Sequence, residues 1–184
     1  IGYGGPCFPR DNVALTYFAD QIGVKASLAH TTDLMNRSVA QKVAARIQPM
    51  LRGGATVAVL GLSYKPFSHV TEESQGVYIA RQLAKAGFRV VAFDPMVAEM
   101  ELDDIRRDMI VLDSIPECLA QAEAVLVTTP DPAFRSLTAS DFENQWSEIL
   151  VFDFWRILTA ELMGVERVRY VGIGTSEDDE ANTS

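Results

Sequence analysis

The chain opens with IGYGGPCFPRD, which places one cysteine, Cys7, in a stretch rich in glycine and proline. Gly4 and Gly5 lie just ahead of it, and residues of these types favour a tight loop over a helix or a strand. A thiolate is a nucleophile, and a loop can present it to a substrate. The alternative is a small buried thiol, which is the usual fate of a lone cysteine. Cys118, within a helical apolar pattern, fits that second description.

A second candidate for ligand chemistry is GLSYKP at residues 61–66, directly after a Val-rich run. Doubly wound sheets bind ligands at the carboxyl ends of their strands. A dinucleotide fingerprint would need G-x-G-x-x-G here, and only its first glycine, Gly61, is present. Asp94, after the next strand, could hold a cofactor ribose or start a turn. We expect this edge to hold another nucleotide, with Lys65 as a point charge for phosphate or, with similar weight, as a solvated lysine.

The hydrophobic pattern predicts the elements that position these residues. Helical periodicity covers residues 12–23 and, as one long amphipathic segment, residues 25–51. Beyond residue 55, short Val-rich runs alternate with helical stretches. Strands are predicted at residues 56–62, 88–95, 122–130, 148–154 and 168–174, and helices at 74–87 and 115–122. This order predicts an α/β fold, a Rossmann-like doubly wound and mostly parallel sheet preceded by a long helical segment.

The same pattern divides the chain into three parts. Residues 1–52 hold the opening loop and the helices, residues 53–175 form the sheet domain, and residues 176–184 are an acidic tail that we expect to be disordered. The long segment has an apolar stripe that packs on its own domain or on a second chain. We expect a homodimer through residues 26–51.

Composition excludes several classes of partner. The formal net charge is -9, from 16 basic and 25 acidic residues, which argues against a nucleic-acid backbone. No apolar run is long enough for a bilayer and no signal-peptide pattern leads the chain, so no membrane is expected. Two cysteines make no disulfide framework, which favours a reducing cytoplasm. His30 and His69 lack metal-ligand spacing, so no metal is predicted. A start at Ile1 within an apparent motif leads us to expect an upstream part.

Two long segments together resemble the UDP-glucose/GDP-mannose dehydrogenase family. GYGGPCFPRD is similar to the family's nucleophile loop, G-[FY]-G-G-x-C-[FL]-x-K-D. VAVLGLSYKPFSHVTEESQGVYIARQLAKAGFRVVAFDP is similar to the start of its nucleotide-sugar domain, which carries G-L-[AS]-[FY]-K-x. VFDFWRIL is similar to its late F-D-x-x-R strand end, so the resemblance covers residues 1–173. Family members carry an NAD-binding domain ahead of the cysteine loop, and that domain is not within this sequence.

The resemblance implies an enzyme of polysaccharide biosynthesis that oxidises the primary alcohol of a UDP- or GDP-sugar to a carboxylate and reduces two NAD+. Cys7 matches the catalytic nucleophile. Its thiolate would add to the intermediate aldehyde, and the thiohemiacetal would then give a hydride and become a thioester that water hydrolyses. Asp11 matches the residue that orients or activates this water, although an acid also suits the start of a helix.

The remaining site residues follow from the same resemblance. Gly4 and Phe8 match loop residues that touch the sugar, and Tyr64 and Lys65 match the pair that contacts the nucleotide sugar. Arg156 matches the arginine of F-D-x-x-R, whose guanidinium can grip phosphate or hydroxyl groups. NAD is expected to be bound mainly by the missing domain, with no cofactor-binding residue in this chain, which alone should be inactive.

Three positions depart from the family pattern. Arg10 stands where a lysine is usual, Glu72 where an arginine is common, and His69 where an aspartate is frequent. Glu72 reverses a charge near the domain junction. Two other readings therefore stay open: a nucleotide-binding module that has lost turnover, and an interaction domain that dimerises through the long helix.

Overall fold

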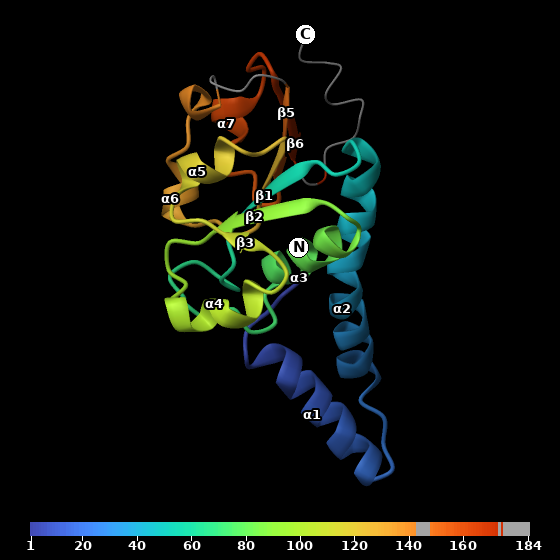
Figure 1. Cartoon of the computed structure of the whole chain (residues 1–184). Helices are drawn as coiled ribbons and strands as arrows, with labels where there is room; N and C mark the ends of the chain where they lie inside the picture. Colours follow the sequence, from blue (N-terminus) through green and yellow to red (C-terminus); the bar gives the residue numbers. More distant parts are fainter. Residues whose placement is uncertain (143–147, 173, 175–184) are drawn as a thin grey trace.

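The computed structural model describes residues 1–142, 148–172 and 174. It consists of a sheet with helices on both faces and a hairpin of two helices that extends away from the sheet (Figure 1). The predicted acidic tail, residues 176–184, lies outside the described residues.

The sheet has six strands, all parallel, in the order β3-β2-β1-β4-β5-β6. Their bounds are Thr56–Leu60 (β1), Arg89–Phe93 (β2), Ile110–Val111 (β3), Ala124–Val127 (β4), Ile149–Asp153 (β5) and Val168–Gly172 (β6). The predicted Rossmann-like, doubly wound fold is thus confirmed. Every residue of β1 and β4 is buried, because helices cover both faces. This explains why these strands read as continuous apolar runs without alternation.

Two separate cores hold the helices against the sheet. Helices α3 (Gln75–Lys85) and α4 (Glu99–Ile105) pack on one face together with the end of α2. On the other face lie α5 (Ile115–Leu119), α6 (Pro132–Arg135), the short 3₁₀ turn Ala139–Asp141 and α7 (Thr159–Leu162). The chain reverses its direction of winding between β1 and β4. In such sheets this switch point is where a ligand cleft forms.

The hairpin consists of α1 (Phe8–Gln21) and α2 (Ser27–Ile47). The predicted start of α1 at residue 12 was wrong, because a proline in the first turn suits a helix start and the N–H of Asp11 already donates to the carbonyl of Cys7 at 2.8 Å. The segment predicted to reach residue 51 ends as an α-helix at Ile47, because Pro49, in a 3₁₀ turn at Gln48–Met50, cannot continue it.

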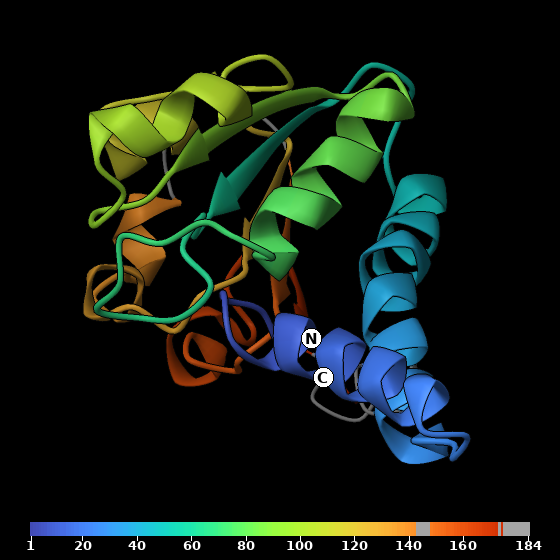
Figure 2. The ribbon, with the colours of Figure 1, turned by 90° about the horizontal axis from the view of Figure 1, so that it is seen from below.

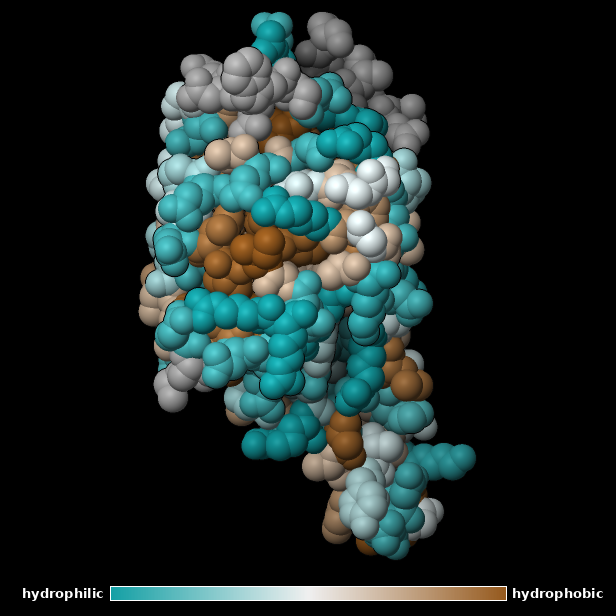
Figure 3. All heavy atoms as spheres, in the orientation of Figure 1, coloured by the Kyte–Doolittle hydropathy of each residue, from teal (hydrophilic) through white to brown (hydrophobic). Residues whose placement is uncertain are grey.

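The apolar stripe of α2 divides into two halves. Ala40, Ala44 and Ile47 are buried in the core beside α3, and Figure 2 shows the two helices running close together. Leu28 and Met35, nearer the tip of the hairpin, are exposed, as are most of the large apolar side chains of α1. Figure 3 shows exposed apolar surface, in brown, on the protruding hairpin. Among the helices that the structure describes, none combines the length and apolar character needed to cross a bilayer.

Candidate functional site

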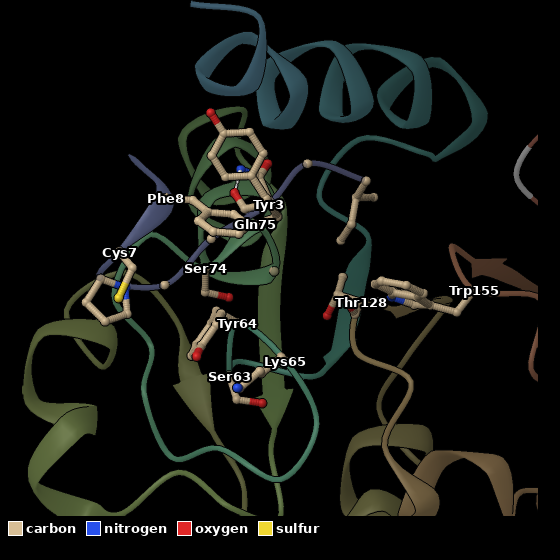
Figure 4. A pocket seen from close by; sticks show the side chains of 16 residues that line it. Tyr3, Cys7, Phe8, Ser63, Tyr64, Lys65, Ser74, Gln75, Thr128 and Trp155 are labelled. Atoms are coloured by element: carbon tan, nitrogen blue, oxygen red, sulfur yellow. Dashed lines mark hydrogen bonds between the residues drawn. The ribbon is translucent and has the colours of Figure 1, made fainter. Parts of the chain in front are cut away.

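A cleft of about 640 Å³ opens at the carboxyl ends of β1, β4 and β5, next to the switch point of the sheet (Figure 4). Its walls come from the opening loop, the segment after β1, the first turn of α3 and the loops after β4 and β5. The cleft therefore joins segments that are far apart in the sequence. Of the predicted site residues, it brings together Gly4, Cys7, Phe8, Tyr64 and Lys65.

The opening loop is held in place through the backbone of Tyr3. The side-chain amide of Asn36, on α2, accepts from the N–H of Tyr3 and donates to its carbonyl, both at 2.9 Å. Gln75 Nε2, at the start of α3, donates to the same carbonyl at 3.2 Å. Asn12 donates to the Tyr3 hydroxyl at 2.8 Å. Four hydrogen bonds from three helices thus fix one residue four positions ahead of Cys7.

Two glycines let this loop lie flat against the rest of the site. A Cβ on Gly4 would come 2.3 Å from the carbonyl oxygen of Glu73. Gly5 has a φ of 85°, and a Cβ there would come 2.5 Å from the ring of Tyr64. The N–H of Gly5 also donates to the carbonyl of Glu72 at 3.0 Å. Only glycine permits this approach and this backbone conformation.

The loop delivers an exposed Cys7 to one end of the cleft, at the N-cap position of α1 (Figure 4). Backbone N–H groups in the first turn of a helix favour negative charge. The ring of Phe8 stands edge-on to that of Tyr3, with the centroids 6.1 Å apart. Cys118, the second cysteine, lies in a different environment. It is fully buried, and burial, followed by the charge of Glu117, raises the pKa of its thiol to about 12.

The middle of the cleft lies between β1 and α3. Gly61 has a φ of 116°, and a Cβ on it would come 2.5 Å from Thr129 Oγ1. A Cβ on Gly76 would lie 2.3 Å from the carbonyl oxygen of Gly61. This contact brings the first turn of α3 to the edge of the sheet, where Ser74 accepts from the N–H of Val77. A helix start in this position suits an anionic group such as phosphate.

Lys65 lines the same cleft as this helix start. Its ammonium is 5.3 Å from the ring centroid of Tyr64, which is within cation–π range. No ion pair joins Lys65 to a carboxylate in the part of the chain that the structure describes. The positive charge is therefore available to a ligand.

Asp94 serves the protein backbone. One carboxylate oxygen accepts from the N–H groups of Leu62 and Ser63, each at 2.7 Å, and the other accepts from those of Met96 and Val97. Of the two roles considered, the structure shows the turn. With its carboxylate occupied and the second and third glycines of the fingerprint absent, this sheet edge does not fit NAD.

Two predicted site residues do not line the cleft. Asp11 lies in the first turn of α1 and pairs with Arg10 at 3.3 Å, and both side chains are largely exposed. Arg156 is exposed, has a φ of 54° and follows Trp155, which does line the cleft. The catalytic role of Asp11 and the binding role of Arg156 stay predictions.

Several lining residues were not predicted from the sequence, notably Ser63, Ser74, Gln75, Thr128 and Trp155. Thr128 directly follows β4, and Trp155 comes two residues after β5. Both could have been found by the rule already applied to β1, that side chains at the carboxyl ends of strands face the ligand. Gln75 gave no such signal, because its role depends on a contact with a distant loop.

Residues 58–160 match the UDP-binding domain of the UDP-glucose/GDP-mannose dehydrogenase family, and residues 1–38 match the central domain of that family. A UDP-glucose 6-dehydrogenase of Rhizobium meliloti (strain 1021) is 31% identical over 182 residues, which cover 94% of this chain and 40% of that protein. The corresponding YwqF protein of Bacillus subtilis (strain 168) is 26% identical, over 95% of this chain and 40% of its own.

Solved structures give the same picture. A UDP-glucose dehydrogenase from Pyrobaculum islandicum superposes with a TM-score of 0.71 at 28% identity, covering 83% of this chain and 34% of that one. A GDP-mannose dehydrogenase from Pseudomonas aeruginosa superposes with a TM-score of 0.70 at 24% identity, covering 83% and 36%, and supports the fold alone. The chain thus spans about 40% of the length of the curated relatives named above.

Proposed function

Because the chain belongs to the UDP-glucose/GDP-mannose dehydrogenase family, we propose that it is the part of a nucleotide-sugar dehydrogenase that binds the nucleotide sugar and supplies the thiol for its oxidation. The observation that carries this proposal is a single cleft lined by an exposed cysteine, Cys7, and a lysine without a carboxylate partner among the described residues, Lys65. The residues that line the cleft suit a ligand with a reactive alcohol near Cys7 and a diphosphate near Lys65.

The role of Cys7 begins after the primary alcohol has lost a hydride and a proton and become an aldehyde. The thiolate adds to the aldehyde carbon, the carbonyl oxygen takes up a proton, and a thiohemiacetal results. Loss of a second hydride and a proton gives a thioester. Water then attacks, the C–S bond breaks, and the carboxylate leaves with the thiolate restored. NAD+ is the proposed hydride acceptor, held by residues outside this chain, because the sheet edge does not fit it.

The other residues bind and orient the substrate. Lys65 and the first turn of α3 would hold the diphosphate, since a point charge and a helix start both favour anions. Gly4 and Phe8 would contact the sugar beside Cys7. The ring of Tyr64 packs closely against Gly5 of the opening loop. We further propose that Asp11 orients the hydrolytic water and that Arg156 adds a contact to phosphate or hydroxyl groups.

The hairpin supplies the proposed partner surface. Leu28, Met35 and the large apolar residues of α1 are exposed, and a second copy that covers them would remove this apolar surface from water. We therefore propose a homodimer through α1 and α2. Light scattering tests it: the expected result is twice the monomer mass, and a monomer at every workable concentration would contradict the proposal.

A nucleotide-binding module without turnover is the second candidate. Glu72 favours it, because this exposed acid stands where the family commonly has an arginine. The residue lies next to the opening loop, since its carbonyl accepts from the N–H of Gly5. Carboxylate formation by the complete protein separates the two candidates, since only an enzyme forms the product.

Binding of nucleotide sugars to this chain is the first test. UDP-glucose, GDP-mannose and UDP-N-acetylglucosamine are screened by thermal shift, because a ligand that binds only the folded state stabilises it by about 2.7 kcal/mol at one hundred times its Kd. Cys7 is then alkylated with iodoacetamide with and without the best ligand. We expect a raised Tm and slower alkylation. If no nucleotide sugar raises the Tm or slows the reaction, the proposed function is wrong.

A further inference from the structure

The end of the cleft away from Cys7 is aromatic. Trp155 lies two residues beyond β5 and lines this end, and 46% of the residue is exposed although it is large and apolar (Figure 4). Thr128 lies beside it, at the end of β4. The described part of the cleft thus runs from a thiol at one end to an indole ring at the other.

The indole is fixed in place by the protein. Its Nε1–H donates to the carbonyl of Thr128 at 2.9 Å, and its backbone N–H donates to Asp153 Oδ1 at 3.0 Å. Asp153 is fully buried and also accepts from the N–H of Leu158 at 2.8 Å. Because the single polar atom of the indole is already used, the ring can offer a ligand only its apolar π-face. Because hydrogen bonds already hold both the backbone and the indole of Trp155, a ligand that stacks on the ring loses little side-chain entropy in ordering it.

The other aromatic rings of the cleft are less suited to stacking. The ring of Tyr64 packs closely against the backbone of Gly5 and has the Lys65 ammonium near it. Phe8 stands edge-on to the ring of Tyr3 and lies toward the Cys7 end. Among the described residues that line the cleft, Trp155 is therefore the aromatic ring placed for a planar group at the far end.

The order of chemical groups along the cleft now defines the ligand. A nucleophilic thiol comes first, the helix start of α3 and Lys65 come next, and an aromatic face comes last. A nucleotide sugar has the matching order of hydroxyl-bearing sugar, diphosphate and base. Resting on the proposed function, we propose that Trp155 is the stacking platform for the nucleobase, a specificity-determining residue that sets which end of the substrate faces Cys7.

Stacking of this kind has a recognisable signature. Every base has a π-face, so stacking tolerates a change of base, whereas a ligand without a base gains nothing from it. Loss of a base–aromatic stack lowers affinity by about 5- to 140-fold. The inference therefore separates UDP and UDP-glucose, which have a base, from glucose 1-phosphate, which carries only the sugar and phosphate.

The chain offers a direct readout, because it contains two tryptophans. In a Trp146→Phe variant, whose changed position lies outside the described residues, Trp155 is the sole indole. We expect UDP and UDP-glucose to quench its fluorescence to saturation and glucose 1-phosphate to leave it unchanged. By calorimetry, Trp155→Ala should lower UDP affinity at least fivefold, while Trp155→Phe, which keeps a planar ring, should retain most of it.

Two failures are distinguishable. If UDP-glucose binds the chain and protects Cys7, but Trp155→Ala and Trp155→Leu bind UDP within twofold of the parent, the inference is overturned and the proposed function stands. If none of UDP-glucose, GDP-mannose and UDP-N-acetylglucosamine binds the parent chain, the proposed function fails and the inference fails with it. Circular dichroism of each variant shows whether it is folded, and Trp155→Phe gives a second measurement if Trp155→Ala is not.

Discussion

Replacement of Asn36 by alanine tests how the opening loop, which carries Cys7, is held. Asn36 is 6% exposed, and its amide makes two hydrogen bonds of 2.9 Å with the backbone of Tyr3. Each such bond contributes about 0.5–1.5 kcal/mol net, and a buried N–H left without a partner costs a further 1–3 kcal/mol or so. In Asn36→Ala the carbonyl of Tyr3 keeps its bond from Gln75, whereas its N–H loses the partner.

These terms add up to an expected loss of about 2–6 kcal/mol in the free energy that holds the loop. Urea unfolding of the chain measures the global part of this loss. If the loop detaches locally, the loss appears instead in the protection of Cys7 from iodoacetamide by bound UDP-glucose. Asn12→Ala is the matched control, because it removes only the bond to the Tyr3 hydroxyl, which water can replace, and should change either quantity by less than about 1 kcal/mol.

One result would refute this reasoning. If Asn36→Ala has the urea midpoint of the parent chain and Cys7 is equally protected by the ligand, the clamp on Tyr3 does not position the loop. The glycine contacts with Tyr64 and the Glu72–Glu73 segment would then be sufficient by themselves.

Three further predictions concern the cleft. Lys65→Ala should weaken nucleotide-sugar binding about tenfold by calorimetry, through loss of a charge-assisted bond. The control Lys42→Ala, on α2, should leave the affinity unchanged. Equal affinities for Lys65→Ala and the parent chain would remove Lys65 from the site. Cys7→Ser in the complete enzyme should stop carboxylate formation, whereas Cys118→Ser should retain turnover and lose only modest stability for a buried hydroxyl; product from Cys7→Ser at the parent rate would disprove the assignment. Gly61→Ala should lower the free energy of unfolding by about 3 kcal/mol or more, from backbone strain plus a clash, and Gly87→Ala, with a φ of 90° and open space around it, should lose only the strain; similar losses in both would show that the contact costs nothing.

The parts of the fold that the sequence predicted are those that local patterns determine. β1 and β4 were evident because burial on both faces demands unbroken apolar runs. β3 was not predicted because it is two residues long and, among the described strands, pairs with β2 alone. The start of α1 was placed too late because a proline near Cys7 was interpreted as part of a loop, although the first turn of a helix tolerates it equally well.

The site was predicted less completely, for a physical reason. Tyr64 and Lys65 were predicted because ligands bind at the strand ends of a parallel sheet, and Cys7 because the opening loop resembles a known one. All three line the cleft. Asn36 could not be found from periodicity. It occupies a buried position of α2 that a hydrophobic pattern assigns to solvent, and it is tolerated there because Tyr3 satisfies its amide.

The thin packing of α1 has a consequence for how the molecule opens. Two of its 14 residues, Pro9 and Ala19, are buried, whereas all five residues of β1 are buried between two cores. Amide protons of α1 are therefore expected to exchange with solvent through local opening, and those of β1 through global unfolding. Cys7 lines the cleft and is also tied to α1, because its carbonyl accepts the N–H of Asp11 in the first turn of that helix. Fraying of that turn would displace the thiol while the sheet and its cleft remain folded.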